Sequence, residues 1–597
     1  MIRRIPFVLL SLLMVLISSA SLFSTSEAAQ DRWGNEVPSN MLPYEFINPD
    51  PFAFSIQFSS LPGNNPGEYV LQNVYPVCNG AKDFDCIVSV DWIDSNGVSR
   101  PGKFEEYIPV GYRGIWCQDS DRLDPKSCDP ERKTQHFPWT KRILTKGDEN
   151  RLIPDGSRSS IWTFPGLEHE KGNRYLVQAS SVAEMTNQKS PFAKDSVACW
   201  NCGSSQFQIT PVGVSSDTSG LAVKQISYQY KKEGEEINFL ERYGSISNQE
   251  KRCYLGEIKE TPICISRSKD TISPRFRMSI RLKLTRDFLN NRHWLVGRAS
   301  DVKIFTDRQE EFTTITLEGT TIKLPSAVAL VPRTAEGYKL TRIATNKSYA
   351  DSGARNEPVD INDLSGFEGW SNVGSSTMSG SDPGSIGFWE SIESAVDIRT
   401  GGVDSTWFFE TANTSTTDVG WLWPCVKTPQ LSGVIASNAT VMRPTPPKWN
   451  AATETLEFRI ASPHLDEKGK IAEGFYNLSV SREVATCLWG KDVVNARASV
   501  TVVNQDGEKK IFTSSYVVSS GYLNFQIAGF TYSVNTIKIR LEKSTEAPSP
   551  TPQSSESTPK ASKIESQPQK KSITCVKGKT IKKVTTKTCP AGFKKRV

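Results

Sequence analysis

A short stretch near residue 400 combines tryptophans with carboxylates, a combination that suits chemistry on sugars. Residues 388–390 read Phe-Trp-Glu, Asp397 follows, and residues 407–410 read Trp-Phe-Phe-Glu. Sugar rings stack on exposed aromatic faces, and two carboxyl groups about 5 to 10 Å apart can serve as acid and base in glycoside hydrolysis. The candidate carbohydrate-binding residues are Trp389, Glu390, Asp397, Trp407 and Glu410. We favour the plainer interpretation of core aromatics and surface acids, because no sequence rule fixes the carboxyl separation.

The segment just before this stretch is rich in small residues. Residues 365–387 hold six Gly and seven Ser, and a structureless segment of that length inside a domain is usually functional or disordered. Residues 360–366 carry oxygen ligands in the style of a calcium loop, but position twelve is Ser371 where an EF-hand needs Glu. We therefore interpret residues 360–366 as a solvated turn.

Other catalytic or metal-binding patterns are missing from the sequence. The chain has four histidines in unrelated contexts, and it contains no HExxH, GxSxG, P-loop or GxGxxG motif. Cys199-x-x-Cys202 leads into a strand-like pattern and no second CxxC exists, which favours a structural disulfide over a redox or zinc site. The sequence thus predicts no catalytic residue, no metal ligand and no cofactor.

The cysteines and the N-terminus both indicate export. Arg3 and Arg4 precede an apolar run at 7–17, and residues 26–28 (Ser-Glu-Ala) fit a signal-peptidase site, so we expect cleavage after Ala28 or, as a second choice, after Ala20. No later segment approaches eighteen apolar residues, so we expect a chain that does not span the membrane. Twelve cysteines suit an oxidising compartment. The simplest pairing is sequential: Cys78 with Cys86, Cys117 with Cys128, Cys199 with Cys202, Cys253 with Cys264, Cys425 with Cys487, and Cys575 with Cys589; Cys199 and Cys202 could instead reach other partners.

Charge is divided unevenly along the chain. Of the net charge of +6, residues 570–597 contribute +10 and residues 1–28 contribute +1, which leaves −5 for residues 29–569. The candidate anion-binding residues are Lys577, Lys579, Lys582, Lys583, Lys587, Lys594, Lys595 and Arg596. The expected partner is an anionic cell-wall polymer or a membrane surface, with a glycan as a further candidate. Nucleic acid is not expected, because the body is acidic and the protein is exported.

The elements that would position these residues are strands. Residues 275–285 alternate strictly between apolar and polar side chains, which predicts a strand with one buried face. Its polar face carries Arg275, Arg277, Arg281 and Lys283, and we expect it to be solvated and partly paired with acids such as Glu233, Glu235 or Glu236. Hairpins are predicted at 312–324 and at 496–518, with further strands at 521–530 and 533–541 that complete a meander packed as a sandwich.

We therefore expect an all-β protein with several disulfide-stapled β-sandwich-like domains. The expected divisions are a signal peptide at 1–28, β-rich domains at 29–212 and 213–418, a β-sandwich at 419–543, a disordered Pro/Ser linker at 544–572 and a small basic disulfide hairpin at 573–597. The linker carries few apolar side chains, so it cannot offset the entropy of ordering. A bridge between Cys425 and Cys487 would stabilise the sandwich by roughly 4 kcal/mol.

The tail reads ITCVKGK…KKV…CPAGFKK behind the Pro/Ser linker. It resembles a short basic two-cysteine C-terminal module of many exported actinobacterial proteins, and residues 421–543 more faintly resemble a β module of uncharacterised secreted proteins of the same bacteria. The resemblance implies a location at the cell envelope and an architecture, and it brings no activity. We therefore expect a secreted β protein with a structural or interaction role, held at the envelope by its basic tail. The alternative is a secreted carbohydrate-active enzyme or carbohydrate-binding protein.

Overall fold

The structure is a computed structural model of the 597-residue chain. It describes residues 29–47, 58–62, 68–108, 159–189, 197–199, 204–217, 225–232, 235–242, 251–254, 263–268, 272–283, 294–352, 358–373, 375–380, 384–412, 420–427, 430–490, 493, 496–504, 507–514, 516–532, 534–542, 573–577, 580–584 and 594–595. Contacts between residues divide the chain into two compact units, Met1–Ser544 and Thr545–Val597. The predicted signal peptide and the Pro/Ser linker lie outside the described residues.

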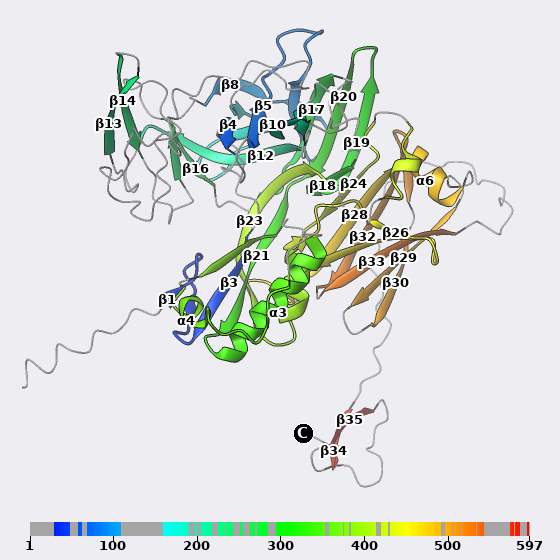
Figure 1. Ribbon diagram of the computed structural model, residues 1–597. Helices are drawn as coiled ribbons and strands as arrows, with labels where there is room; N and C mark the ends of the chain where they lie inside the picture. The colour runs from blue at the N-terminus through cyan, green and yellow to red at the C-terminus, as the bar shows by residue number, and fades with distance from the viewer. Residues whose placement is uncertain are drawn as a thin grey trace, which may run out of the picture. The chain divides into compact units, whose positions relative to one another are not determined.

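The first unit is mostly β structure, as predicted, and one long strand, β23 (Asp397–Thr411), links its layers (Figure 1). The N-terminal part of β23 pairs with β21 (Ile322–Pro332), and its C-terminal part pairs with β12 (Ser204–Ser215) and β18 (Trp294–Arg298). Beyond β21 the sheet continues through β3 (Met41–Ile47) to β22 (Ser376–Ser379). Side chains from distant parts of the sequence are therefore brought into one sheet.

The other side of this large sheet is built on β10 (Arg174–Lys189), which pairs with β12. The strands joined to β10 or to its neighbours are β4 (Phe58–Pro62), β5 (Glu68–Val74), β8 (Lys103–Tyr107), β9 (Ser160–Thr163), β11 (Val197–Cys199), β15 (Lys251–Tyr254) and β16 (Ile263–Arg267). Two separate pairs are β1 (Ala29–Gln30) with β2 (Glu36–Val37), and β13 (Gln225–Lys232) with β14 (Glu235–Arg242).

A five-stranded sheet packs on this large sheet. Its strands, in order, are β19 (Ser300–Arg308), β20 (Phe312–Thr320), β17 (Arg275–Lys283), β6 (Cys86–Ile93) and β7 (Ser99–Pro101). In β17 every second side chain, from Phe276 to Leu282, is buried, which confirms the strand predicted from alternation. These side chains form one core with residues of β10, β12 and β23, including Tyr175 and Trp407.

A continuation of the large sheet and one further sheet form a sandwich with its own core. One face is β24 (Gly433–Ser437), β28 (Glu473–Ser481), β32 (Tyr522–Thr531) and β31 (Val517–Ser519). The other is β25 (Val441–Met442), β26 (Lys448–Asn450), β27 (Thr455–Ala461), β33 (Asn535–Glu542), β29 (Arg497–Asn504) and β30 (Lys509–Ser514). The predicted hairpin β29–β30 is confirmed. The predicted meander is wrong, because β32 and β33 belong to opposite sheets and the chain crosses between them.

Strand pairing crosses the divisions expected from the sequence. β12 runs through residue 212, and β18 pairs in parallel with β24 of the sandwich. Trp294 and Val296 of β18 belong to the sandwich core. The three expected β segments thus pack as one compact unit, because each contributes strands to sheets that the others complete.

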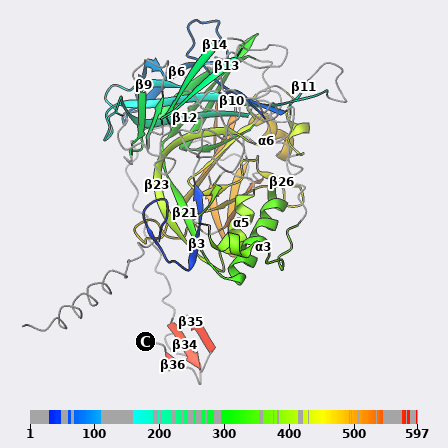
Figure 2. The same cartoon turned by 60° about the vertical axis from the view of Figure 1, so that its left-hand side comes forward.

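Three helices lie beside the sheet formed by β3 and β21: α3 (Ala335–Ser352) and α5 (Ser385–Ile392), seen in Figure 2, and α4 (Phe367–Ser371), seen in Figure 1. Ile386, Phe388 and Trp389 of α5 share a core with Phe46 and Val331 of the two strands. The expectation of a structureless Gly/Ser segment at 365–387 is wrong for much of its length, because α4, β22 and the start of α5 lie there. Its small residues serve close packing: a Cβ on Gly384 would lie 2.8 Å from the Ser348 backbone oxygen of α3.

Two predicted disulfides are present in the first unit. Cys78 is bonded to Cys86, and Cys425 is bonded to Cys487. The second of these joins a short 3-10 helix, η4 (Trp423–Cys425), to α6 (Arg482–Trp489). Cys264 is disulfide-bonded, and its register partner across β15 and β16 is Cys253. The remaining cysteines, whose side chains lie outside the described part of the chain, are Cys117, Cys128, Cys199, Cys202, Cys575 and Cys589.

The second unit is a small three-stranded sheet. β34 (Ile573–Lys577) lies between β35 (Thr580–Val584) and β36 (Lys594–Lys595). The predicted hairpin is present as β34 and β35, and β36 adds a third strand. Within the described residues of both units, no helix is long and apolar enough to cross a membrane.

Candidate functional site

The two tryptophans that were candidates for stacking on sugar are core residues. Trp389 and Trp407 are 1% and 0% exposed. The Trp389 ring lies 4.9 Å from that of Phe46, and the Trp407 Nε1 atom donates a hydrogen bond to the Gly319 carbonyl over 3.0 Å. A sugar needs an open aromatic face, so these two rings do not stack on carbohydrate, and the favoured interpretation of core aromatics is confirmed.

Asp397 and Glu410 do not form an acid–base pair either. Asp397 is exposed at the start of β23, whereas Glu410 is half-buried near its end and accepts a hydrogen bond from Gln206. Thirteen residues of extended strand separate them by on the order of 40 Å, far beyond the separation used in glycoside hydrolysis. Glu390 lies elsewhere, on α5. Of the five candidates, Glu390 lines the pocket described below.

Glu390 belongs to a chain of alternating charges between the helices and the sandwich. The Arg459 Nε atom of β27 donates to Glu390 Oε1 over 2.9 Å, and Arg459 Nη1 lies 3.1 Å from Asp351 Oδ2 of α3. Lys347 Nζ, one turn earlier on α3, is 4.0 Å from Asp351 Oδ1. Burial alone would lower the pKa of Arg459, but the hydrogen bond to Glu390 and the two carboxylate charges raise it above its ordinary value. The guanidinium therefore stays charged and links the helical layer to the sheet.

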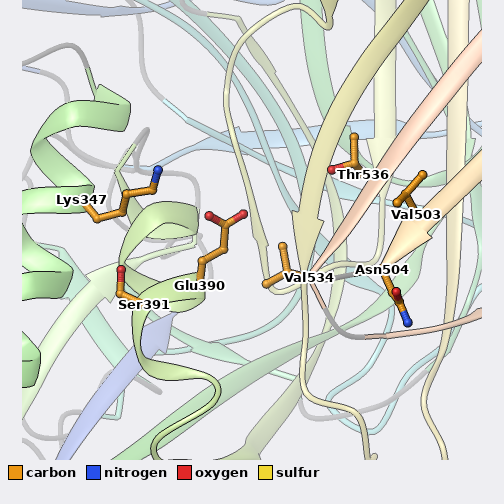
Figure 3. Close-up of a pocket in the computed structure, with 7 residues that line it drawn as sticks. All are labelled: Lys347, Glu390, Ser391, Val503, Asn504, Val534 and Thr536. Carbon is orange, nitrogen blue, oxygen red and sulfur yellow. The ribbon is translucent and has the colours of Figure 1, made fainter. Parts of the chain in front are cut away.

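A pocket of about 440 Å³ opens beside this chain of charges (Figure 3). Its lining residues are Lys347, Glu390, Ser391, Val503, Asn504, Val534 and Thr536. The first three come from α3 and α5, Val503 and Asn504 end β29, Val534 directly precedes β33, and Thr536 lies near the start of β33. Strand register sets the positions of the residues on the sheet side of the pocket. Thr536 of β33 is the direct neighbour of Arg459 of β27 and of Val503 of β29. The pocket offers an ammonium, a carboxylate, two hydroxyls and an amide above two valines.

The remaining sequence candidates have structural partners where the structure describes them. His169 and His464 each hydrogen-bond a backbone carbonyl, of Arg174 and Tyr532, while His136 and His293 lie outside the described residues. In the segment once compared with a calcium loop, Asp360 and Asp363 accept hydrogen bonds from backbone N–H groups two residues on, as in solvated turns. No group of three or more His, Cys, Asp or Glu in the described ranges is placed to hold a metal ion.

The basic face of β17 is paired with acids, as expected, but through a residue the sequence did not indicate. Glu318 of β20 has a side chain that is 3% exposed. Its carboxylate oxygens form ion pairs with the side-chain nitrogens of Arg275 and Arg277, each over 2.7 Å, and of Lys303 over 3.5 Å. Register places Lys303, Glu318, Arg277 and Asp91 side by side on four adjacent strands, so the charges alternate across the sheet. Arg275 and Arg277 therefore hold adjacent strands together through Glu318, while Arg281 donates to backbone carbonyls at 80, 81 and 83.

Glu318 should make stability depend on pH. Burial would raise the pKa of Glu318, but the Arg277 hydrogen bond and the charges of Arg275 and Lys303 lower it below the ordinary 4.5. A folded-state pKa below the unfolded one stabilises the protein above pH 4.5, and this stability is lost as the pH falls through the folded pKa. We expect Glu318→Gln to lower the free energy of unfolding by about 2 kcal/mol at pH 7.

The measurement for Glu318→Gln is urea denaturation of both proteins between pH 3 and pH 8. The difference in free energy of unfolding between the two proteins should decrease as the pH falls below 4.5. Glu467→Gln, at an exposed carboxylate in a turn, is the control and should change stability by less than about 0.5 kcal/mol. A difference in free energy of unfolding that stays constant down to pH 3 would contradict stabilisation by the Glu318 charge.

The basic C-terminal residues lie in the second unit. Lys577, Lys582, Lys583, Lys594 and Lys595 fall in its three strands. Lys579, Lys587 and Arg596 lie outside the described residues. Cys575 at the centre of β34 has Lys582 as its register partner on one side and Lys595 on the other. Cations therefore occupy the two outer strands of a sheet only three strands wide.

These observations define the described part of the chain as a mostly β protein of several packed sheets, with a helical layer and a polar pocket. Comparison with protein-family models, curated proteins and solved structures finds no match to this chain.

Proposed function

We propose that this chain is a secreted protein of the bacterial cell envelope with a structural or interaction role, retained by its basic C-terminal unit. The observation that carries the proposal is the division of charge: +10 in residues 570–597 against −5 in residues 29–569. The division coincides with a division in structure, because the basic residues belong to a compact unit of their own. A tail of this kind can bind an anionic surface while the folded body remains free to meet a partner.

The mechanism of retention is electrostatic and multivalent. Each Lys or Arg near an anionic surface contributes about 1 kcal/mol, and salt screens the attraction within about 10 Å. The cations are held on a small sheet, so several can face one polymer or one layer of headgroups together. Hydrolysis of glycans is not part of the proposal, since burial of Trp389 and Trp407 and the distance between Asp397 and Glu410 argue against it.

Removal of residues 573–597 should release the protein from cells into the medium without unfolding the first unit. Replacing Lys582, Lys583, Lys594 and Lys595 by Gln should weaken retention at low salt on the order of 100- to 1000-fold. A few hundred millimolar salt should release the unaltered protein. The measurement is the ratio of cell-bound to free protein in fractionated cultures.

The matched control removes four charges from the body. Lys103, Lys323, Lys468 and Lys509 are exposed residues of the first unit, and their replacement by Gln should leave retention unchanged. Equal retention of the truncated and the complete protein at low salt would refute the proposal. Equal release by the two sets of four substitutions would show that net charge, and not the C-terminal unit, governs retention.

A further inference from the structure

The pocket between the helical layer and the sandwich is built from four separate segments of the chain. Lys347 comes from α3, Glu390 and Ser391 from α5, Asn504 from the end of β29 and Thr536 from the start of β33. Arg459 fixes Glu390 from the sheet side, and Thr536 is the register neighbour of Arg459. The polar groups therefore sit on rigid elements, and in Figure 3 Glu390 projects from its helix toward the strand side.

The charges at this pocket are compensated inside the protein. Lys347, Asp351, Arg459 and Glu390 alternate in sign along one chain of ion pairs, so their sum is zero. An incoming anion would meet the Glu390 carboxylate, and an incoming cation would meet the Lys347 ammonium. Neither kind of ion gains net attraction, yet both side chains keep hydrogen-bonding capacity toward the pocket.

We propose that this pocket binds a neutral, hydroxyl-rich ligand, namely one or two saccharide units. Sugar hydroxyls donate and accept hydrogen bonds, which matches a carboxylate acceptor, an ammonium donor, an amide and the hydroxyls of Ser391 and Thr536. Val503 and Val534 provide an apolar surface for the carbon atoms of a sugar ring. The volume of about 440 Å³ falls in the range of small-ligand sites, about 300 to 1,000 Å³.

This inference keeps one residue of the carbohydrate site expected from the sequence, Glu390, and relocates the site. It does not depend on the C-terminal unit, because all lining residues belong to the first unit. A zwitterion, such as a dipeptide, could also use an ammonium and a carboxylate. The internal pairing of Glu390 with Arg459 argues against it, because the carboxylate charge is already neutralised.

The test is calorimetric titration of the complete protein with defined probes. The probes are glucose, N-acetylglucosamine, their β-linked disaccharides, glucuronate, glucosamine and alanyl-alanine. We expect at least one neutral sugar to bind with a millimolar or better dissociation constant, and the charged and zwitterionic probes to bind at least tenfold more weakly. Lys347→Met should weaken sugar binding about tenfold and Thr536→Val about threefold, since each removes one hydrogen bond and keeps the side-chain shape.

Lys339→Met is the matched control, because it makes the same replacement on α3 at a residue that does not line the pocket. It should leave the affinity within about twofold, and thermal melting should show that all three variants fold. Absence of sugar binding up to 50 mM, or equal sugar affinity in Lys347→Met, Thr536→Val and the unaltered protein, would overturn the proposal. Preferential binding of alanyl-alanine would overturn it as well.

Discussion

Replacing Arg298 by Met should destabilise the first unit by about 3 to 5 kcal/mol, because it removes a fully buried cation and leaves its acceptors behind. Arg298 ends β18 and is 0% exposed. Its Nη atoms donate to the carbonyls of Ser437, Ala439 and Thr440, in the segment that crosses from β24 to β25. Burial lowers the pKa of Arg298 to about 10, while Glu410 and Tyr532 act in the opposite direction, so the side chain is charged at neutral pH.

Urea denaturation followed by tryptophan fluorescence is the measurement for Arg298→Met. Arg298→Lys should recover part of the loss, because an ammonium keeps the charge but cannot reach three carbonyls in a fork. Arg540→Met is the control: Arg540 and its partner Glu454 are 47% and 60% exposed, and the change should stay within about 0.5 kcal/mol. A loss below about 1 kcal/mol for Arg298→Met would show that the crossing segment does not depend on this side chain.

Strands with one buried face were predictable, because their side chains reveal the period. β17 is buried at every second residue, as its sequence indicates. The β29–β30 hairpin was predictable from its turn, where Asn504 accepts a hydrogen bond from the Glu508 N–H and Gly507 has a positive φ of 77°. In both cases the information is local, so neighbouring residues suffice.

The prediction of a hairpin at 312–324 is wrong because Gly319 was interpreted as a turn residue. Gly319 lies within β20, and β20 pairs with β17 and β19 while β21 pairs with β23 and β3. A Cβ at Gly319 would lie 2.9 Å from the Ala299 Cβ. Glycine is needed here because the layers pack closely, and it does not mark a turn. Sequence alone does not separate these two uses of glycine.

Helix α3 escaped prediction because its buried face carries few large apolar residues, whereas α5 buries large apolar side chains but begins within the Gly/Ser-rich segment that suggested a loop. The buried side chains of α3 include Tyr338, Thr341 and Ala344, which make no apolar stripe of the usual kind. The α3–α5 contact uses Gly384 and Gly387, whose Cβ atoms would meet Ser348 and Asp351. Small residues that suggested a loop therefore allow two helices to approach closely.

The pocket was beyond sequence reasoning for a different reason. Lys347, Glu390 and Thr536 are separated by 43 and 146 positions, and no local motif relates them. Glu390 was noticed through its neighbour Trp389, but the two side chains do different things: the ring enters the core and the carboxylate meets Arg459. Buried and partly exposed side chains alternate along β27, where Arg459 lies between buried Phe458 and Ile460. This alternation was the one indication in the sequence of a polar partner on the sheet.

Removing the Cys425–Cys487 bridge should lower stability by about 4 kcal/mol in the chain-entropy model, since the two residues are 62 positions apart. The bridge ties η4 to α6 at the edge of the sandwich core, where Cys425 is 3% exposed. The double variant Cys425→Ala/Cys487→Ala avoids free thiols, and the loss should appear as a lower midpoint in thermal and urea denaturation.

The Cys78–Cys86 bridge supplies the matched comparison, because it closes a loop of only 8 positions. The same model gives about 2.5 kcal/mol for its removal, so the two double variants should differ by about 1.5 to 2 kcal/mol. The comparison separates the effect of loop length from the effect of local packing. Each double variant loses one disulfide, but the conformational entropy that the unfolded chain gains depends on the length of the loop. If Cys78→Ala/Cys86→Ala costs as much as Cys425→Ala/Cys487→Ala, the long loop confers no extra stability, and local packing around each bridge governs the loss.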